Sequence, residues 1–283
     1  MKTPALTGFA LVAFAANSVL CRLALGGATI DAASFTTVRL AAGACVLLLI
    51  GAVVNKKPPA WHAGRFISAL LLFFYAAAFS FAYINLSAGT GALILFGSVQ
   101  ATMLLAALGS GGRPRPAEWA GLALALCGLV YLVFPGLTAP PLASSTCMTI
   151  AGISWGLYSL RGRGAHDPLA DTTGNFVLAL PLAVAVNLLL LRDVHVSQTG
   201  VLLAVLSGAL ASGVGYVVWY AALRGLTATR AATVQLPVPV LAAVGGVLLL
   251  SEAVTMRLLL AALVILGGVG LALSGRARAA QAD

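Results

Sequence analysis

The sequence predicts an all-α integral membrane protein with ten transmembrane helices, arranged as two inverted repeats of five helices each. Three observations lead to this prediction. The chain has 283 residues, of which 61% are hydrophobic and only 8% charged, whereas roughly a quarter of the residues of a soluble domain are charged. Its uncharged runs are long enough to cross a bilayer. Finally, short stretches of the first half recur, in the same order, in the second half.

Uncharged runs mark the predicted crossings in chain order. A helix needs about 20 apolar residues to cross the hydrocarbon core, so a run of that size counts as one crossing and a run of about twice that size as two. Single crossings are predicted at residues 3–21, 31–55, 172–191, 194–223, 231–251 and 258–275. Two crossings each are predicted in residues 66–112, with a turn near 85–89, and in residues 119–160, with a proline hinge at 134–141.

The two halves of the chain share faint sequence similarities at nearly one spacing. Residues 88–92 resemble residues 227–231, and residues 14–18 resemble residues 155–159. Five crossings per half is an odd number, so the second half enters the membrane from the opposite side. Carriers often use such inverted repeats, with the substrate site between them. We therefore predict one repeat at 1–138 and a second at 139–283, without a soluble domain.

The distribution of positive charge predicts the orientation of the chain. Twelve of the 16 Lys and Arg residues lie at the termini or in even-numbered loops, and only Arg22, Arg39, Arg192 and Arg257 lie elsewhere. Lys and Arg accumulate in cytoplasmic loops. Both termini are therefore predicted in the cytoplasm, in a multi-pass protein of the bacterial inner membrane. The same bias accounts for the net charge of +9 without a nucleic-acid partner.

The stretch at 224–252 combines an uncharged run with residues that break helices. The run at 231–251 contains Gln235 and the prolines Pro237 and Pro239. A proline has no N–H, so each would free a carbonyl within a helix. Freed carbonyls inside a membrane face protein or a watery cavity. The prolines therefore predict either a gating or binding element or a kink that serves packing alone.

These features resemble a known family. The motif L-T-A-T-R-A-A at 226–232 precedes the prolines, and L-L-L-S-E ends at Glu252. The second half carries W-G-L-Y at 155–158, and Arg39 lies inside the second predicted span. With the duplicated ten-span layout, they resemble EamA-type transporters of the drug/metabolite transporter superfamily over essentially the whole chain. The resemblance is strongest to bacterial amino-acid exporters, notably those for aromatic amino acids. The chain departs from the family pattern at Gly112-Arg113 (in place of Gly-Glu), Phe14 (in place of Trp) and Ser98 (in place of Pro).

Polar and aromatic side chains inside the predicted spans are the candidates for substrate binding. Polar groups within a membrane are costly and face the bundle interior. The candidate substrate-binding residues are Asn17, Tyr75, Ser98, Gln100, Trp155, Tyr158, Tyr216 and Gln235. The amides suit an amino-acid zwitterion and the rings an apolar side chain, although each residue can equally join helices to one another. Trp219 and Tyr220 are interpreted as anchors at the cytoplasmic interface.

Arg39, Pro237, Pro239 and Glu252 are predicted to act in gating or in the scaffold. Arg39 lies eight residues from Asp31, a distance of about 12 Å along a helix. Its guanidinium can attract a substrate carboxylate, pair with backbone carbonyls, or extend outward to Asp31 and hold the scaffold. The scaffold interpretation is favoured, because the resemblance gives this arginine to carriers of varied substrates.

The predicted function is a secondary-type carrier. It would export small metabolites, especially aromatic or other apolar amino acids, by alternating access through a central cavity between the repeats. A transporter of quaternary-ammonium drugs or of other metabolites with the same fold is the alternative. An enzyme would need a catalytic cluster, and a channel would need rings of charge or a carbonyl filter; neither pattern is present in the sequence. The predicted partners are a small-molecule substrate and membrane lipid, with no cofactor or metal, and a monomer suffices.

Energy coupling is predicted from the placement of acidic residues. A proton-driven carrier commonly titrates an acid or a histidine within the membrane. The seven acidic residues are all predicted at the ends of spans: Asp31, Asp193 and Glu252 outside, and Glu118, Asp167, Asp171 and Asp283 inside. The sequence therefore predicts facilitated transport without obligatory proton coupling, and leaves sodium open.

Overall fold

The structure of the chain is a computed structural model, which describes residues 2–55, 65–109, 116–134, 136, 139–162, 167–223 and 234–279. Within this part of the chain the regular structure is helical, apart from one isolated antiparallel bridge between Ile30 and Val196. The prediction of a helical protein is confirmed over these residues.

The helices begin and end close to the predicted turns along most of the chain. They are α1 (Lys2–Gly26), α2 (Ala32–Asn55), α3 (Phe66–Tyr83), α4 (Ala88–Gly109), α5 (Pro116–Val133), α6 (Leu142–Gly162), α7 (Pro168–Leu189), the short η2 (Leu191–Asp193), α8 (Gln198–Leu206), η3 (Ser207–Val214), α9 (Gly215–Leu223), α11 (Val238–Leu250) and α12 (Met256–Ala279). Because α8, η3 and α9 follow one another without a break, they act as one long helix.

Within the described residues, six helical segments are long and apolar enough to cross a membrane: α1, α2, α3, α4, α7 and the continuous α8–η3–α9. Shorter apolar helices lie within α5, α11 and α12. Large apolar side chains are exposed on the outside, such as Val53 (76%), Leu248 (75%) and Leu263 (72%). An exterior of this kind would be a liability in water and suits contact with lipid. The chain is a multi-pass membrane protein.

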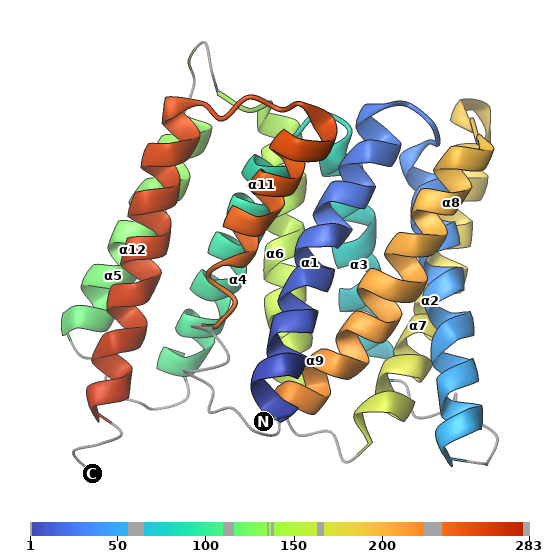
Figure 1. Cartoon of the computed structure of the whole chain (residues 1–283), viewed down its shortest axis with the longest axis horizontal. Coiled ribbons are helices and arrows are strands. Elements are labelled where there is room, and N and C mark those ends of the chain that lie inside the picture. The colour runs from blue at the N-terminus through green and yellow to red at the C-terminus, as the bar shows by residue number, and fades with distance from the viewer. Residues whose placement is uncertain are drawn as a thin grey trace.

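The helices stand side by side in a bundle, which Figure 1 shows from one face. The start of α1 and the end of α12 lie at the same, lower end of the bundle in this view. Helices from distant parts of the sequence pack together: α1 contacts α9 and α11, α4 contacts α6 and α11, and α5 pairs with α12 at one edge (Figure 1). We call the end that holds the start of α1 the terminal end, and the opposite one the loop end.

The stretch with two prolines differs from the prediction. Pro237 is the N-cap residue of α11 and Pro239 lies in its first turn, where a missing N–H leaves no helical hydrogen bond unmade. The carbonyl of Gln235 is not free, because the Val238 N–H donates to it over 3.0 Å. The prolines therefore lie where a turn at 235–237 separates helical Val234 from α11, and the Gln235 carbonyl is not freed as predicted. The other carbonyl, on residue 233, and the whole motif at 226–232 lie outside the described residues.

The helix that spans α8 and α9 contains an unusual segment. From Ser207 to Val214 the backbone forms a π-helix of eight residues, η3. π-helical segments are rare and occur frequently at functional sites. Gly208 lies in this segment directly against the backbone of Arg39, and a side chain in its place would meet the Arg39 carbonyl oxygen. η3 and α2 therefore approach each other closely at Gly208.

Candidate functional site

A hydrogen-bonded network of polar side chains joins four helical segments inside the bundle. The Ser207 hydroxyl donates to Asn17 Oδ1 over 2.6 Å, and Asn17 Nδ2 donates to the Tyr75 hydroxyl over 3.3 Å. Arg39 donates to the same hydroxyl from Nη2 over 3.1 Å and to Ser212 Oγ from Nε over 3.2 Å. All five side chains are buried, with exposed fractions of 4% or less. We call these residues the polar layer.

The π-helix explains how two serines of one helix reach this layer. In a π-helix the backbone hydrogen bonds join residues five apart, so such residues lie about one turn from each other. In an α-helix, residues three or four apart would share a face instead. Ser207 and Ser212 are five apart, and both face the first half of the chain, where Ser207 meets Asn17 and Ser212 meets Arg39. The π-helix thereby supplies two hydroxyls to the polar layer.

A cluster of aromatic rings adjoins the polar layer, with Trp155 at its centre. The Trp155 ring lies 4.7 Å from that of Tyr216, 4.9 Å from Tyr75, 5.6 Å from Tyr158 and 6.1 Å from Phe14, measured between centroids. Such separations are typical of stacked and edge-to-face aromatic pairs. The rings come from α1, α3, α6 and α9. Tyr75 belongs to both the polar layer and this aromatic cluster, so the two form one continuous site.

The aromatic cluster extends toward the terminal end through Tyr158. There a small cavity of about 20 Å³ lies between α3, α6, α7 and α9, enough for about one water molecule. Its lining is polar and includes Arg65, Ser68, Tyr158, Arg161, Asp171 and Tyr220. The Tyr158 hydroxyl faces this cavity and lies 3.4 Å from Asn175 Nδ2, which donates to it. A narrow polar opening thus reaches the aromatic cluster from the terminal end.

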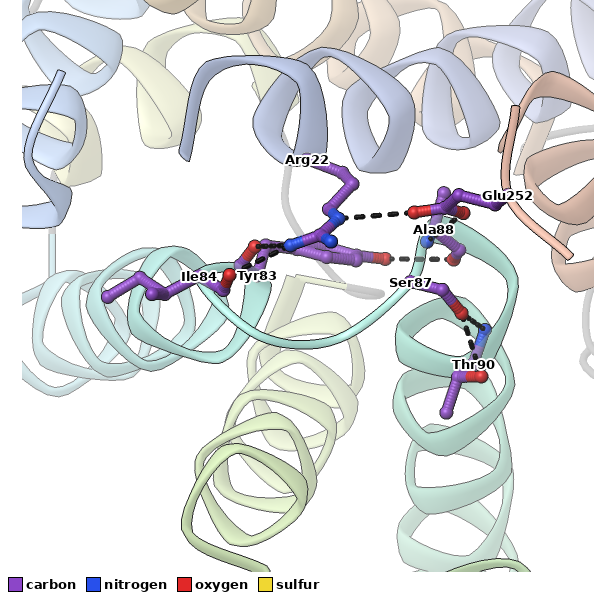
Figure 2. A network of polar contacts seen from close by, with 7 residues as sticks. All are labelled: Arg22, Tyr83, Ile84, Ser87, Ala88, Thr90 and Glu252. Carbon is purple, nitrogen blue, oxygen red and sulfur yellow. Dashed lines mark hydrogen bonds and ion pairs between the residues drawn. The ribbon is translucent and has the colours of Figure 1, made fainter. Parts of the chain in front are cut away.

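An ion pair at the loop end joins residues far apart in sequence. Figure 2 shows Arg22, at the end of α1, beside Glu252, which follows α11, with 3.1 Å between Arg22 Nε and Glu252 Oε1. Arg22 Nη1 also donates to the carbonyls of Tyr83 (3.1 Å) and Ile84 (2.8 Å) at the end of α3. Glu252 Oε2 accepts from the Ala88 N–H at the start of α4 over 2.8 Å. We call this group the outer clasp.

Helix dipoles favour the arrangement of charges in the outer clasp. The C-terminal end of a helix is partially negative and the N-terminal end partially positive. The arginine lies at the end of α3 and the glutamate at the start of α4, so each charge meets the helix end of opposite sign. Ser87 completes the cap of α4 by accepting from the Thr90 N–H over 3.2 Å (Figure 2).

The turn after α11 aims Glu252 at this position. Ser251 adopts the left-handed conformation, with φ 54° and ψ 32°, and ends the helix. Glycine is the usual residue in such a C-cap, because a side chain is strained there. The turn lets the Glu252 N–H donate to the Gly246 carbonyl over 3.1 Å. Gly246 also leaves the space that the carboxylate occupies, since a side chain there would meet Glu252 Oε2.

The structure brings together part of the predicted substrate-binding set. Asn17, Tyr75, Trp155, Tyr158 and Tyr216 all belong to the polar layer or the aromatic cluster. The other three predicted residues lie at different positions. Ser98 packs on α6 at Gly152, Gln100 is buried on α4, and Gln235 is buried in the turn before α11.

Two interpretations of the sequence are corrected. Arg39 does not extend to Asp31, because that carboxylate accepts from the N–H groups of Ser34 (2.8 Å) and His195 (3.1 Å) at the loop end. Trp219 and Tyr220 are not interfacial anchors, because both are buried, with 3% and 7% exposed. The Trp219 ring packs on Phe14 at 5.6 Å. Their helix faces α1 and not lipid.

Three residues of the site lacked a clear signal in the sequence. Ser207 and Ser212 reach the polar layer only because the backbone is π-helical, and no local residue pattern announced that geometry. Arg22 appeared only as one of four arginines outside the cytoplasmic loops. One observation in the sequence hinted at an ion pair. Arg22 lies at the end of a span, and a single acid, Glu252, ends the proline-containing stretch.

The bundle has an apolar exterior and a buried interior that is polar and aromatic. This is the architecture of a polytopic membrane protein whose chemistry takes place inside the bundle. The chain belongs to the EamA-like transporter family, which matches residues 4–134 and again residues 144–274. It is therefore a membrane transporter of small molecules.

Two known proteins are similar to this chain over nearly its whole length. The chain is 50% identical over 275 residues to the "Uncharacterized protein PA1977" of Pseudomonas aeruginosa (strain PAO1), covering 97% of this chain and 96% of that protein. It is also similar to a solved crystal structure of another protein, with a TM-score of 0.66 over 94% of this chain and 95% of that chain. The second likeness, at 21% sequence identity, concerns the fold alone.

Proposed function

We propose that the protein is a secondary carrier that exports small metabolites, specifically amino acids with aromatic or other apolar side chains, from the bacterial cytoplasm. Transport would follow alternating access between two inverted five-helix repeats, at 1–138 and 139–283, that together cross the inner membrane ten times. One observation carries the proposal: polar and aromatic side chains of both halves meet in a single buried site. Carriers built from inverted repeats bind their substrate at such an interface.

The packing of helices supports the repeat. If α6, α7, α8–η3–α9, α11 and α12 are the counterparts of α1 to α5, the contact between α4 and α6 corresponds to that between α11 and α1. The contact of α3 with α7 corresponds in the same way to that of α8 with α2, while α5 with α12 is its own counterpart. The second family match begins 140 residues after the first (144 − 4), close to the spacing of the sequence similarities.

The outer clasp supports a gate at the loop end. It joins Arg22 of α1 to the ends of α3 and α4 and to Glu252 after α11, beside a cavity of about 300 Å³ that Asn85, Thr90 and Thr255 help to line. With both termini in the cytoplasm, this gate would face the outside. Release of substrate would then require the contacts between Arg22, Glu252 and the ends of α3 and α4 to separate.

Counterflow in proteoliposomes tests the carrier. Vesicles loaded with unlabelled phenylalanine should take up labelled phenylalanine faster than empty vesicles, because a carrier returns faster when loaded. Equal uptake in both would contradict a carrier and favour a channel. Competition by aromatic, aliphatic and cationic amino acids then ranks the substrates.

A quaternary-ammonium drug belongs in the same competition. Aromatic cages bind such cations by cation–π attraction, and the rings around Trp155 favour this second candidate function. Arg39 opposes it, because its own charge already lies against the rings of Tyr75 and Phe79, at 5.2 Å and 4.9 Å. We expect the drug to compete more weakly than phenylalanine. Stronger competition by the drug would favour the second candidate.

The orientation and the coupling are tested separately. In a cysteine-free background, Arg192→Cys on η2 should react with an impermeant reagent added outside the cell, and reaction only after permeabilisation would invert the topology. In sodium-free vesicles held at constant voltage, a pH gradient should not drive phenylalanine uphill. Accumulation that collapses with a protonophore would contradict facilitated transport.

A further inference from the structure

The guanidinium of Arg39 is a buried charge without an acidic partner among the described residues. Arg39 is 1% exposed and stays protonated under all physiological conditions. Two of its three nitrogens donate to hydroxyls, on Tyr75 and Ser212, whereas Nη1 has no hydrogen-bond partner. The ion pair that the structure describes joins Arg22 to Glu252 instead. A buried charge whose counter-charge is missing is strongly unfavourable.

The immediate surroundings of Arg39 compensate its charge only in part. The guanidinium carbon lies 5.2 Å from the ring centre of Tyr75 and 4.9 Å from that of Phe79. Ring faces attract a cation, but they do not neutralise it. The Tyr75 hydroxyl already receives hydrogen bonds from both Arg39 and Asn17. What the position lacks is an acceptor that carries negative charge.

A second unpaired donor lies close to the first. The Tyr216 hydroxyl is buried and makes no hydrogen bond of full geometry, with the hydroxyls of Tyr75 and Ser212 close by, and it is near enough to Arg39 for the two groups to interact electrostatically. Tyr216 is also the ring that stacks closest on Trp155. A ligand with two adjacent anionic oxygens can accept from both Arg39 Nη1 and Tyr216. Its apolar part would then lie among the aromatic rings.

The same region offers no matching group for a substrate ammonium. Among the described acids, Asp31 and Glu252 are engaged at the loop end, and Asp171 lines the cavity at the terminal end. Arg39 itself repels a second positive charge. The site therefore holds one charge of a zwitterion and leaves the other to neutral dipoles.

We propose that Arg39, with Tyr216, binds the carboxylate of an apolar substrate, and that the amino group is dispensable. The substrate class is thus aromatic and apolar monocarboxylates, of which amino acids are one kind. This inference rests on the proposed function only in taking the polar layer as the substrate site. It assigns Arg39 to the ligand, where the sequence alone favoured the scaffold.

Three compounds that share a phenylethyl group separate the two charges of the ligand: 3-phenylpropionate, L-phenylalanine and 2-phenylethylamine. Equilibrium binding to the purified full-length protein in lipid nanodiscs is the readout. We expect 3-phenylpropionate to bind at least as tightly as phenylalanine, and the amine at least tenfold more weakly than the acid, the ratio that about 1.4 kcal/mol produces. An amine that binds as tightly as the acid, or an acid that does not bind, overturns the inference.

Substitutions assign the effect to the named residues. Arg39→Gln should lower the affinity for 3-phenylpropionate at least tenfold and abolish the preference over the amine, and Arg39→Lys should keep part of that preference. Arg192→Gln, which removes an exposed arginine of η2, is the matched control and should bind like the wild type. If Arg39→Gln does not fold, Tyr216→Phe decides. It should weaken acid binding several-fold and leave amine binding unchanged, and equal effects on both compounds overturn the inference.

Binding is measured here without transport, so the two proposals fail separately. Acid-selective, Arg39-dependent binding in a protein that shows no counterflow would contradict the carrier and keep this inference. Counterflow in a protein that binds the amine as tightly as the acid would support the carrier and contradict this inference.

Discussion

Arg22 and Arg39 lie on α1 and α2, which follow one another in the chain, and the surroundings of the two arginines differ in a way that distinguishes a contact between helices from a binding site. The Arg22 side chain is 23% exposed and has a carboxylate and two backbone carbonyls as partners. Arg39 is 1% exposed and has two hydroxyls. The deeper arginine, for which an unpaired charge is the more costly, is the one without an acid. A complete set of partners suits a contact that holds helices together, and an incomplete set suits a contact that receives a ligand.

The largest effect is expected at Arg39. Arg39→Gln should lower the counterflow rate per folded carrier roughly 100-fold, which corresponds to about 2.7 kcal/mol, because the ligand loses its counter-charge in a buried site. Arg39→Lys should retain a measurable rate. Wild-type counterflow in well-folded Arg39→Gln would return Arg39 to a scaffold role and end the contrast with Arg22.

The packing that holds Arg39 in place is tested at Gly208. A methyl group there would meet the Arg39 carbonyl oxygen, and overpacking of this kind costs about 1–3 kcal/mol. Gly208→Ala should lower thermal stability accordingly and displace α2 from η3. Gly267→Ala, at a position inside α12 with nothing within 4 Å, is the control and should not lower stability, because alanine favours a helix more than glycine does. Similar stability of both variants would mean that η3 adapts without cost.

The outer clasp should show a smaller coupling, and an unusual failure of charge exchange. Because the pair is partly exposed, a double-mutant cycle of Arg22→Gln and Glu252→Gln should give about 1 kcal/mol in unfolding free energy. The exchanged variant, Arg22→Glu with Glu252→Arg, should not recover stability, since each charge would then face a helix end of its own sign. Full recovery would show that the ion pair acts without the ends of α3 and α4.

The smallest effect is expected from the serines of the π-helix. Ser212→Ala removes one neutral hydroxyl from Arg39, and interhelical hydrogen bonds in membranes average about 0.6 kcal/mol. Thermal stability of Ser212→Ala should fall slightly. Its loss of ligand affinity should be larger than that of Ser207→Ala, because Ser207 contacts Asn17 and not Arg39. Equal effects of the two substitutions on affinity would argue against a special environment at Arg39.

Much of the helical layout was predictable, because charge in lipid is energetically costly and membrane-crossing segments therefore contain few charged residues. The apolar run at 31–55, in which Asp31 and Arg39 are the only charged residues, anticipates α2 almost residue for residue, and the turn near 85–89 falls between α3 and α4. Such boundaries depend on local composition alone. The number of crossings and their inverted arrangement stay predictions.

The site was predictable only where a residue's burial follows from its type. Asn17, Tyr75 and Trp155 are polar or amphipathic groups within apolar runs, so a place inside the bundle follows. The prediction for Trp219 and Tyr220 was wrong, because it depended on their distance in sequence from the nearest arginine. That distance indicates how deep a residue lies in the membrane, but not whether its side chain faces lipid or another helix. Arg39 was given Asp31 as a candidate partner from distance along one helix, whereas Asp31 caps the helix itself through the Ser34 N–H.

The prolines show the limit of reading one element at a time. A proline frees a carbonyl only where the helical ladder would otherwise continue through it. In the structure a turn at 235–237 separates helical Val234 from α11, and the Gln235 carbonyl has a partner in the Val238 N–H. Which carbonyl a proline leaves free depends on the turn in which it lies.

The outer clasp also sets an order of events during synthesis. Arg22 and Glu252 are 230 residues apart, and chains grow at about 5–20 residues per second, so Glu252 is made roughly 10 to 45 s after Arg22. Until then α1 has only the carbonyls at the end of α3 for its arginine. The first half must therefore wait in the membrane without this ion pair, and the outer clasp is complete only when α11 and Glu252 have been made.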